Sequence, residues 1–97
     1  MSRHQGVSDN GIARDLAEIT DIAVEAAQEC RRATTIHGPI NSPHEAYGVI
    51  FEELGEYWSE AQKKRQARSP QKMREELIQV AAMAIRTIYD LKLQPGR

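Results

Sequence analysis

Hydrophobic residues recur every three or four positions over three stretches of the chain, and glycine and proline interrupt the pattern between the stretches. The first stretch covers about residues 10–34, and its hydrophobic positions are Ile12, Leu16, Ile19, Ala23, Ala26 and Cys30. Residues at this spacing lie along one side of an α-helix, and the Gly38-Pro39 pair ends it. Because no stretch shows the alternation of a β-strand, we expect an all-α fold with three main helices.

The other two helices begin with recognisable signals. The sequence Ser42-Pro43-His44-Glu45 supplies a capping serine, a proline for the first turn and the glutamate of a capping box. This second helix is expected to continue to about residue 65. The Ser69-Pro70 pair repeats the signal and predicts a third helix that ends at about residue 91.

The third helix is hydrophobic on nearly all sides between Leu77 and Ile85, with Gln79 as the one polar exception. A surface helix of a three-helix domain needs a hydrophobic stripe on one side only. We therefore expect the third helix to lie near a subunit interface, in a helical bundle that a homodimer or homotetramer completes.

Length and charge narrow the possible function classes. The 97 residues (10.9 kDa) suffice for one domain, expected over residues 1–97 with flexible tails at 1–9 and 93–97. The formal net charge of -1 disfavours a nucleic-acid binder such as an antitoxin-like DNA-binding protein. The single Cys30 excludes an intramolecular disulfide. The chain has neither a run of about 20 hydrophobic residues nor a secretory signal, so we expect a cytoplasmic protein.

The near-zero net charge conceals a separation of acids from bases. Five acids and no lysine or arginine lie between Glu45 and Glu60, whereas six bases and no acid lie between Lys63 and Arg74. At about 100° per residue, the acids cluster opposite a hydrophobic face. That face consists of Tyr47, Ile50, Phe51, Leu54, Tyr57, Trp58 and Ala61. It is expected to pack in the core, including the side chains of Tyr47 and Trp58.

Two interpretations of the acids remain open at this point. They can form a solvated helix face on which Glu60 pairs with a lysine one turn further on. Alternatively, a cation compensates Glu52, Glu53 and Glu56, which have no basic partner one turn away on this helix. If the second and third helices pack antiparallel, Glu56 comes level with Glu76. Carboxylates from two facing helices form an oxygen-rich site that suits Mg2+.

The segments SPHEAYGVIFEELGE (42–56) and EELIQVAAMA (75–84) resemble the MazG-like family of all-α nucleoside triphosphate pyrophosphohydrolases. The family pattern is E-E-x-x-E on one helix and E-x-x-D on the next. The corresponding residues of this chain are Glu52, Glu53, Glu56, Glu76 and Gln79. Gln79 stands where the family has an aspartate, so the site has one negative charge fewer. The resemblance covers roughly residues 27–91.

The resemblance implies cleavage of a nucleoside or deoxynucleoside triphosphate to the monophosphate and pyrophosphate, with Mg2+ as cofactor and Mn2+ as a substitute. It implies metal ligands at Glu53, Glu56 and Glu76. Gln79 becomes a weak ligand or a hydrogen-bond donor to phosphate, and Glu52 becomes a further ligand or the catalytic group that orients the attacking water. The missing charge leaves an alternative open, a non-catalytic helical oligomerisation or adaptor module that retains the scaffold.

Basic residues supply candidate contacts to the substrate phosphates, namely Lys63, Lys64, Lys72 and Arg86. A solvated surface charge is the alternative for each of them. For Arg86 the alternative is an intersubunit salt bridge with an acid of the first helix, such as Glu25 or Glu29. His37 follows the first helix and can border a nucleotide pocket, whereas His4 belongs to the expected N-terminal tail.

Overall fold

The computed structural model describes residues 9–93, 95 and 96. They form three α-helices, α1 (Asp9–His37), α2 (Pro43–Ala61) and α3 (Pro70–Asp90), together with a short 3-10 helix, η2 (Arg65–Ala67). No strand occurs among these residues, so the expected all-α class is confirmed. Within the described ranges, no helix combines the length and the hydrophobicity that a membrane span requires.

The helix ends agree with the sequence signals except at the end of α2. α1 continues to His37 and ends at Gly38, whose φ of 75° lies in the left-handed region that glycine adopts without strain. α2 ends at Ala61, about four residues before the expected end. The expected tails are not tested, because residues 1–8 (with His4), 94 and 97 lie outside the described residues.

Side chains cap both α2 and α3 at their first turns. The hydroxyl of Ser42 accepts a hydrogen bond from the Glu45 N–H at 3.0 Å, as expected for a capping box. The Glu45 carboxylate accepts from the N–H of Asn41 at 2.7 Å, one residue further back than in the standard box. Ser69 accepts from the N–H of Lys72 at 3.1 Å, which confirms it as the cap of α3.

The buried carboxylate of Glu60 fixes the turn between α2 and α3. It accepts hydrogen bonds from Lys63 Nζ at 2.9 Å and from the backbone N–H of Ser69 at 2.7 Å. These contacts join the last turn of α2 to the capping residue of α3, so α2 ends early and the chain reverses through η2. Glu60 therefore pairs with Lys63, as the sequence predicts, and also supports the fold.

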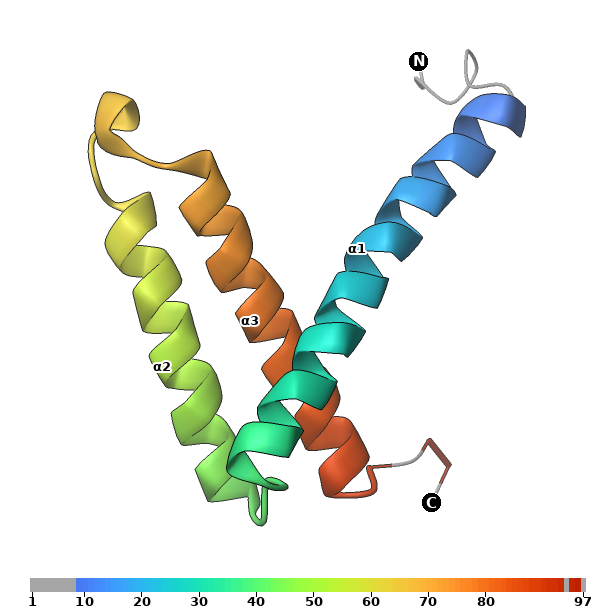
Figure 1. The fold of residues 1–97 in the computed structure, drawn as a ribbon, viewed down its shortest axis with the longest axis vertical. Coiled ribbons are helices and arrows are strands. Elements are labelled where there is room, and N and C mark those ends of the chain that lie inside the picture. Colours follow the sequence, from blue (N-terminus) through green and yellow to red (C-terminus); the bar gives the residue numbers. More distant parts are fainter. Residues whose placement is uncertain (1–8, 94, 97) are drawn as a thin grey trace.

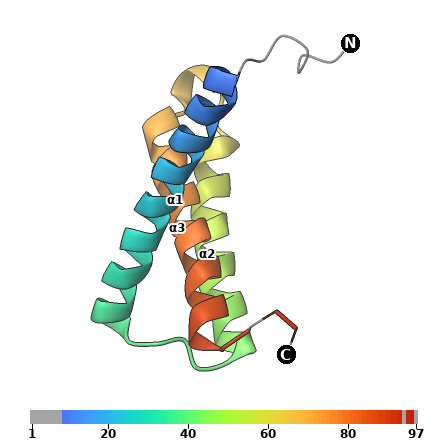
Figure 2. The same ribbon diagram turned by 90° about the vertical axis from the view of Figure 1, so that its right-hand side faces the viewer.

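α3 packs against both other helices, whereas the backbones of α1 and α2 do not approach each other closely in the described part of the chain. α2 runs antiparallel beside α3, and α1 crosses α3 and then diverges toward its own N-terminus (Figures 1 and 2). Small side chains allow the close crossing, since Ala26 and Ala33 of α1 are buried. Glu25 and Arg74 form a two-pronged ion pair between α1 and α3, with both N–O distances at 2.7 Å.

The hydrophobic core of the single chain is small. Its buried members are Ala33, Ala82 and Met83, with Cys30, Val49 and Ile50 packed against them. The aromatic face of α2 points outward: Tyr47 is 71% exposed, Trp58 is 60% exposed, and Phe51 stacks on Tyr47 at 5.8 Å between ring centroids. The expectation that this face packs in the core is therefore wrong for Tyr47, Phe51, Leu54 and Trp58, whereas Ile50 does pack against the core. The buried residues of α2 are Ala46 and Glu60, which lie outside this face.

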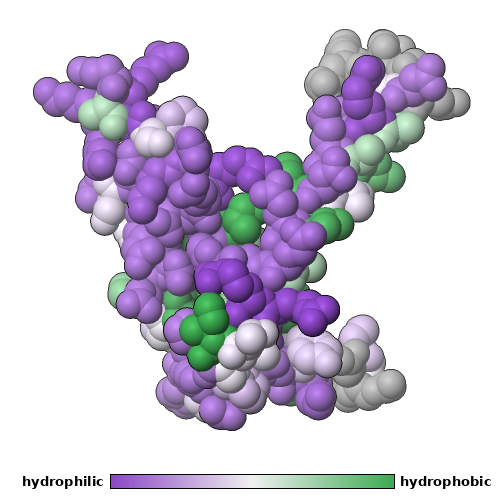
Figure 3. Space-filling model, in the orientation of Figure 1, coloured by the Kyte–Doolittle hydropathy of each residue, from purple (hydrophilic) through white to green (hydrophobic). Residues whose placement is uncertain are grey.

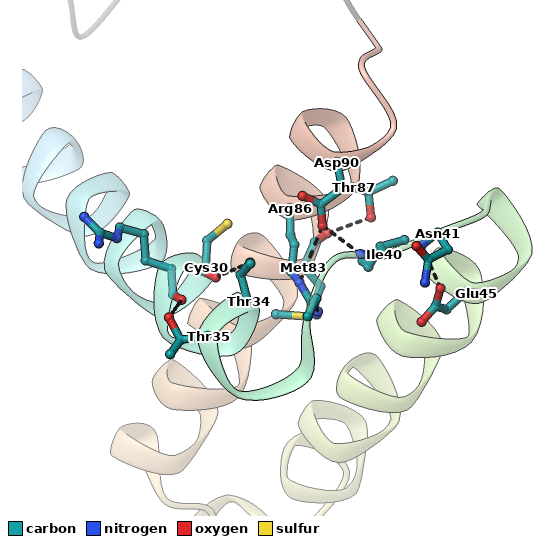
Figure 4. Close-up of polar contacts among 12 residues, drawn as sticks. Cys30, Thr34, Thr35, Ile40, Asn41, Glu45, Met83, Arg86, Thr87 and Asp90 are labelled. Carbon is teal, nitrogen blue, oxygen red and sulfur yellow. Dashed lines mark hydrogen bonds and ion pairs between the residues drawn. The ribbon is translucent and has the colours of Figure 1, made fainter.

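A polar latch joins the α1–α2 loop to the end of α3 (Figure 4). The Asp90 carboxylate accepts a hydrogen bond from the N–H of Ile40 at 2.8 Å and lies 3.8 Å from Nε of Arg86. Arg86 also donates to the carbonyl of Gly38. Both charged side chains are almost fully buried, at 5% and 6% exposure. Asp90 lies unfavourably at a helix C-terminus, and the latch explains its position.

Replacing Asp90 by alanine is expected to lower the free energy of unfolding by about 3 kcal/mol, because it leaves the Ile40 N–H and the buried Arg86 charge without this partner. Urea unfolding at one fixed protein concentration measures the effect. Asp21→Ala, at an exposed position of α1, is the matched control and should change the stability little. Equal stability of the two variants would refute the latch.

Candidate metal centre

Three glutamates from two helices converge at the seam between α2 and α3. Glu53 and Glu56 lie one turn apart on α2, and Glu76 lies in the second turn of α3. Each offers a carboxylate oxygen within 4.8 Å of the others. We call these three residues the acidic cluster. α2 and α3 do pack antiparallel (Figure 1), which is the condition under which the sequence brings Glu56 level with Glu76.

Two members of the acidic cluster, Glu53 and Glu56, have a raised pKa and therefore resist ionisation. Partial burial raises the pKa of Glu53, and the negative charges of Glu56 and Glu76 raise it further. Burial also raises the pKa of Glu56, and the neighbouring Glu76 carboxyl acts in the same direction. The fold therefore holds together three groups whose ionised forms repel one another.

One lysine contacts the acidic cluster directly. Lys72 Nζ lies 3.2 Å from Glu76, one turn before it on α3, and this ion pair raises the pKa of Lys72. The Lys72 charge also lowers the pKa of Glu56 slightly, against the stronger opposing effects. A single exposed lysine therefore neutralises only part of the negative charge.

The acidic cluster opens into a cavity of about 560 Å³ between the three helices. This volume lies in the range of about 300–1,000 Å³ that is usual for small-molecule sites. Acidic and polar side chains dominate its wall, including the sequence candidates Glu52, Gln79 and Arg86. Lys63, Lys64 and Lys72 are not part of the lining. Lys63 pairs with Glu60, and Lys64 precedes η2 in the turn.

Arg86 is buried at the base of the cavity. Its guanidinium donates to the Gly38 carbonyl and faces the Met83 sulfur at 3.6 Å, while its Nε has no hydrogen-bond partner within the described residues. Its ion-pair partner in the chain is Asp90. Within the chain, Glu25 and Glu29 pair with Arg74 and Arg32, and an intersubunit salt bridge of Arg86 with such an acid stays a prediction.

Sequence reasoning missed the wall that α1 contributes. Glu29 and Arg32 line the cavity, together with His37, which the sequence placed beside a nucleotide pocket. The sequence holds only a weak indication that Glu29 would lie at this cavity. Glu29 precedes Cys30, which lies on the hydrophobic stripe of the first helix, so it flanks the side of α1 that packs. Helical periodicity cannot show that this side meets the same seam as the acids of α2.

Comparisons with protein-family models, with curated proteins and with solved structures found no match for this chain. The function of the cavity is therefore inferred from its own chemistry and from the motif resemblance.

Replacing Glu56 by glutamine is expected to raise the melting temperature of the metal-free protein at pH 7.5. The pKa of Glu56 is raised above its ordinary value of 4.5 on folding. The stability that this group contributes is thus fully present below about pH 4.5 and is lost as the pH rises through the raised pKa. Glutamine removes the charge, so the gain should appear at neutral pH and shrink toward pH 4.

Thermal unfolding in EDTA over pH 4–8 measures this gain. Glu18→Gln removes a charge from an exposed position of α1 outside the cavity and is the matched control. A melting temperature of Glu56→Gln at or below that of the unchanged protein at pH 7.5 would contradict the prediction.

Proposed function

We propose that the chain is a MazG-like nucleoside triphosphate pyrophosphohydrolase that depends on Mg2+. The reaction would use water to cleave the α–β phosphoanhydride bond of a nucleoside or deoxynucleoside triphosphate, releasing the monophosphate and pyrophosphate. The observation that carries the proposal is the acidic cluster, in which three carboxylates from two helices approach within 4.8 Å at the wall of a cavity.

The chemistry of the acidic cluster fits a hard divalent cation. Mg2+ binds oxygen ligands and is commonly held by a few carboxylates together with substrate phosphates and water. Glu53 is half-buried, Glu56 is exposed and Glu76 is buried, so the cluster is anchored on one side and open on the other. A cation bound there would relieve the repulsion that raises the pKa of Glu53 and Glu56.

The side chains around the cavity suggest a division of roles. Glu53, Glu56 and Glu76 would hold the cation, and Glu52, exposed beside them, would orient the attacking water and accept its proton. The chemistry that Mg2+ supplies when bound is neutralisation of phosphate charge and a lower pKa for that water. Gln79 offers an amide to the same cavity.

Among the basic candidates, Lys72 is the contact to phosphate that we retain. It lies 3.2 Å from Glu76 and needs only a change of side-chain conformation to reach an anion above the acidic cluster. Lys64 lies in the turn between α2 and α3 and does not line the cavity. The Arg86 guanidinium already donates a hydrogen bond to the Gly38 carbonyl of the α1–α2 loop.

Pyrophosphate release from a panel of nucleoside and deoxynucleoside triphosphates tests the proposed activity. Release is expected to require Mg2+ or Mn2+, and Glu56→Gln and Glu76→Gln should each lower it at least a hundredfold, because each removes a proposed ligand. Glu18→Gln should keep full activity.

Thermal unfolding provides the complementary readout, since a ligand that binds only the folded state raises the melting temperature. The absence of pyrophosphate release, together with no shift at millimolar metal and a non-hydrolysable nucleotide, would favour the oligomerisation or adaptor module instead. Unchanged activity in both cluster variants would refute the assignment of the ligands.

We further propose that the working unit is a homodimer or homotetramer. The Cα radius of gyration is 16.6 Å, whereas a compact domain of this length has about 13 Å. The accessible surface is 7609 Å², against about 5,600 Å² for a compact monomer of this mass. Hydrophobic residues interrupt the hydrophilic surface along the arm that α1 forms (Figure 3). Ile12, Leu16 and Ile19 of α1 and Leu77 and Ile88 of α3 are exposed.

Light scattering coupled to size-exclusion chromatography is expected to give at least a dimeric mass at micromolar concentration. Ile88→Lys should shift the equilibrium toward the monomer, because it places a charge on an exposed hydrophobic position of α3. Gln28→Lys, at an exposed polar position of α1, is the control and should leave the mass unchanged. A monomeric mass of the unchanged protein would refute the proposed assembly.

A further inference from the structure

Hydrophobic side chains cover the side of the α2–α3 pair that faces away from the cavity. They follow one another along α2 at intervals of four, three and four residues, and the same intervals recur along α3. All of them are exposed in the single chain, and none lines the cavity. We call this surface the back face. It consists of Tyr47, Phe51, Leu54 and Trp58 of α2 and of Leu77, Ala81, Ala84 and Ile88 of α3.

Helix geometry places both halves of the back face opposite the cavity. At about 100° per residue, Leu54 lies on the other side of α2 from Glu56, and Ala84 lies on the other side of α3 from Arg86. Glu56 and Arg86 both line the cavity. The two hydrophobic stripes therefore share the opposite side of the helix pair.

The two sides of the α2–α3 pair differ in charge. The back face contains no acid and no base. On the cavity side, the lining from these two helices includes Glu52, Glu53, Glu56, Glu75 and Glu76. Two copies that met through their cavity sides would bring like charges together, which opposes association. The back face is therefore the side of the pair that suits a second copy of the chain.

The back face is complementary to itself. Five residues before Glu56 on α2 is Phe51, and five residues after Glu76 on α3 is Ala81. Because Glu56 and Glu76 meet across the antiparallel pair, Phe51 and Ala81 lie at about the same level. A two-fold rotation about an axis parallel to the helices keeps this level and lays α2 of one copy over α3 of the other. Each Phe51 ring then meets a small side chain, Ala81 of the partner subunit, as close packing requires.

The uncovered area is large enough for such a contact. The accessible surface of 7609 Å² exceeds the about 5,600 Å² of a compact monomer by more than the about 800 Å² that a standard interface takes from each partner. Tyr47, Phe51 and Trp58 are all more than half exposed. Aromatic side chains of this kind are enriched in the centre of protein interfaces.

We propose that a second copy of this chain binds at the back face, giving a two-fold dimer whose centre is a four-helix bundle of both α2–α3 pairs. The inference rests on the assembly stated under the proposed function and goes beyond it by naming the surface and its symmetry. The two cavities open on opposite sides of the dimer, so each acidic cluster stays accessible. Because each copy contacts both helices of the other, dimerisation stabilises the helix pair that carries the acidic cluster.

Light scattering coupled to size-exclusion chromatography at micromolar concentration tests the surface. Phe51→Lys is expected to give a monomeric mass, because it places a charge in a hydrophobic contact. Leu16→Lys is the matched control, since Leu16 of α1 is 62% exposed against 63% for Phe51 but lies outside the back face. This control should stay at least dimeric. Either an assembled Phe51→Lys or a monomeric Leu16→Lys would overturn the proposal.

Disulfide trapping tests the two-fold arrangement without adding a charge, and it decides the question if Phe51→Lys does not fold. Phe51→Cys and Ala81→Cys are each introduced into a Cys30→Ala chain, and the two chains are refolded together and oxidised. The mixture is expected to yield a covalent dimer, whereas neither chain alone should. A mixture without the covalent dimer, or a covalent dimer of the Phe51→Cys chain alone, would contradict the proposed arrangement.

The back face and the proposed assembly fail in different ways. A monomeric mass of the unchanged protein refutes both of them. If the unchanged protein is an oligomer and Phe51→Lys keeps the same mass, the assembly stands and the back face is not its interface. Neither result removes the proposed metal site, because the back face lies outside the lining of the cavity.

Discussion

Electrostatic repulsion among Glu53, Glu56 and Glu76 is the constraint around which the rest of the structure is arranged. The packing of α2 on α3 brings their carboxylates within 4.8 Å of one another, and one exposed lysine is the nearest compensation. Ionising Glu53 and Glu56 opposes folding, as their raised pKa values indicate. Three carboxylates that repel one another lower the stability of the fold, so stability alone does not explain their presence. Groups with perturbed pKa values in a cleft are typical of functional sites.

Contacts at both ends of the α2–α3 pair hold the acidic cluster together. At one end, Glu60 joins the last turn of α2 to Ser69, the cap of α3. At the other end, Asp90 and Arg86 attach the loop before α2 to the last turns of α3. Because both ends are fixed, the two helices keep one register, and the glutamates meet at the seam. The charged residues at these ends therefore position the acidic cluster, and Arg86 also lines the cavity into which the cluster opens.

The two halves of α1 differ in what they contact, and part of the hydrophobic surface of the chain is left uncovered. α1 contributes Glu29 and Arg32 to the cavity through its C-terminal half, while its N-terminal half extends away with its hydrophobic stripe uncovered. The aromatic face of α2 is uncovered as well. A second copy could bury these surfaces, none of which belongs to the lining of the cavity.

The sequence by itself determined the three helices and both capped starts, because these follow from local spacing and capping signals. It allowed an antiparallel pair in which Glu56 meets Glu76 but left a solvated acidic face as the alternative, and the tertiary structure decided between them. It did not determine which face of α2 packs on α3, so Tyr47 and Trp58 were expected inside and lie outside. Nor did it assign Arg86 and Asp90 to a latch or Glu29 to the cavity. The latch depends on contacts between residues some 50 positions apart, and the place of Glu29 depends on how α1 crosses α3. Helical periodicity records which residues share a face, and only the tertiary structure decides what that face meets.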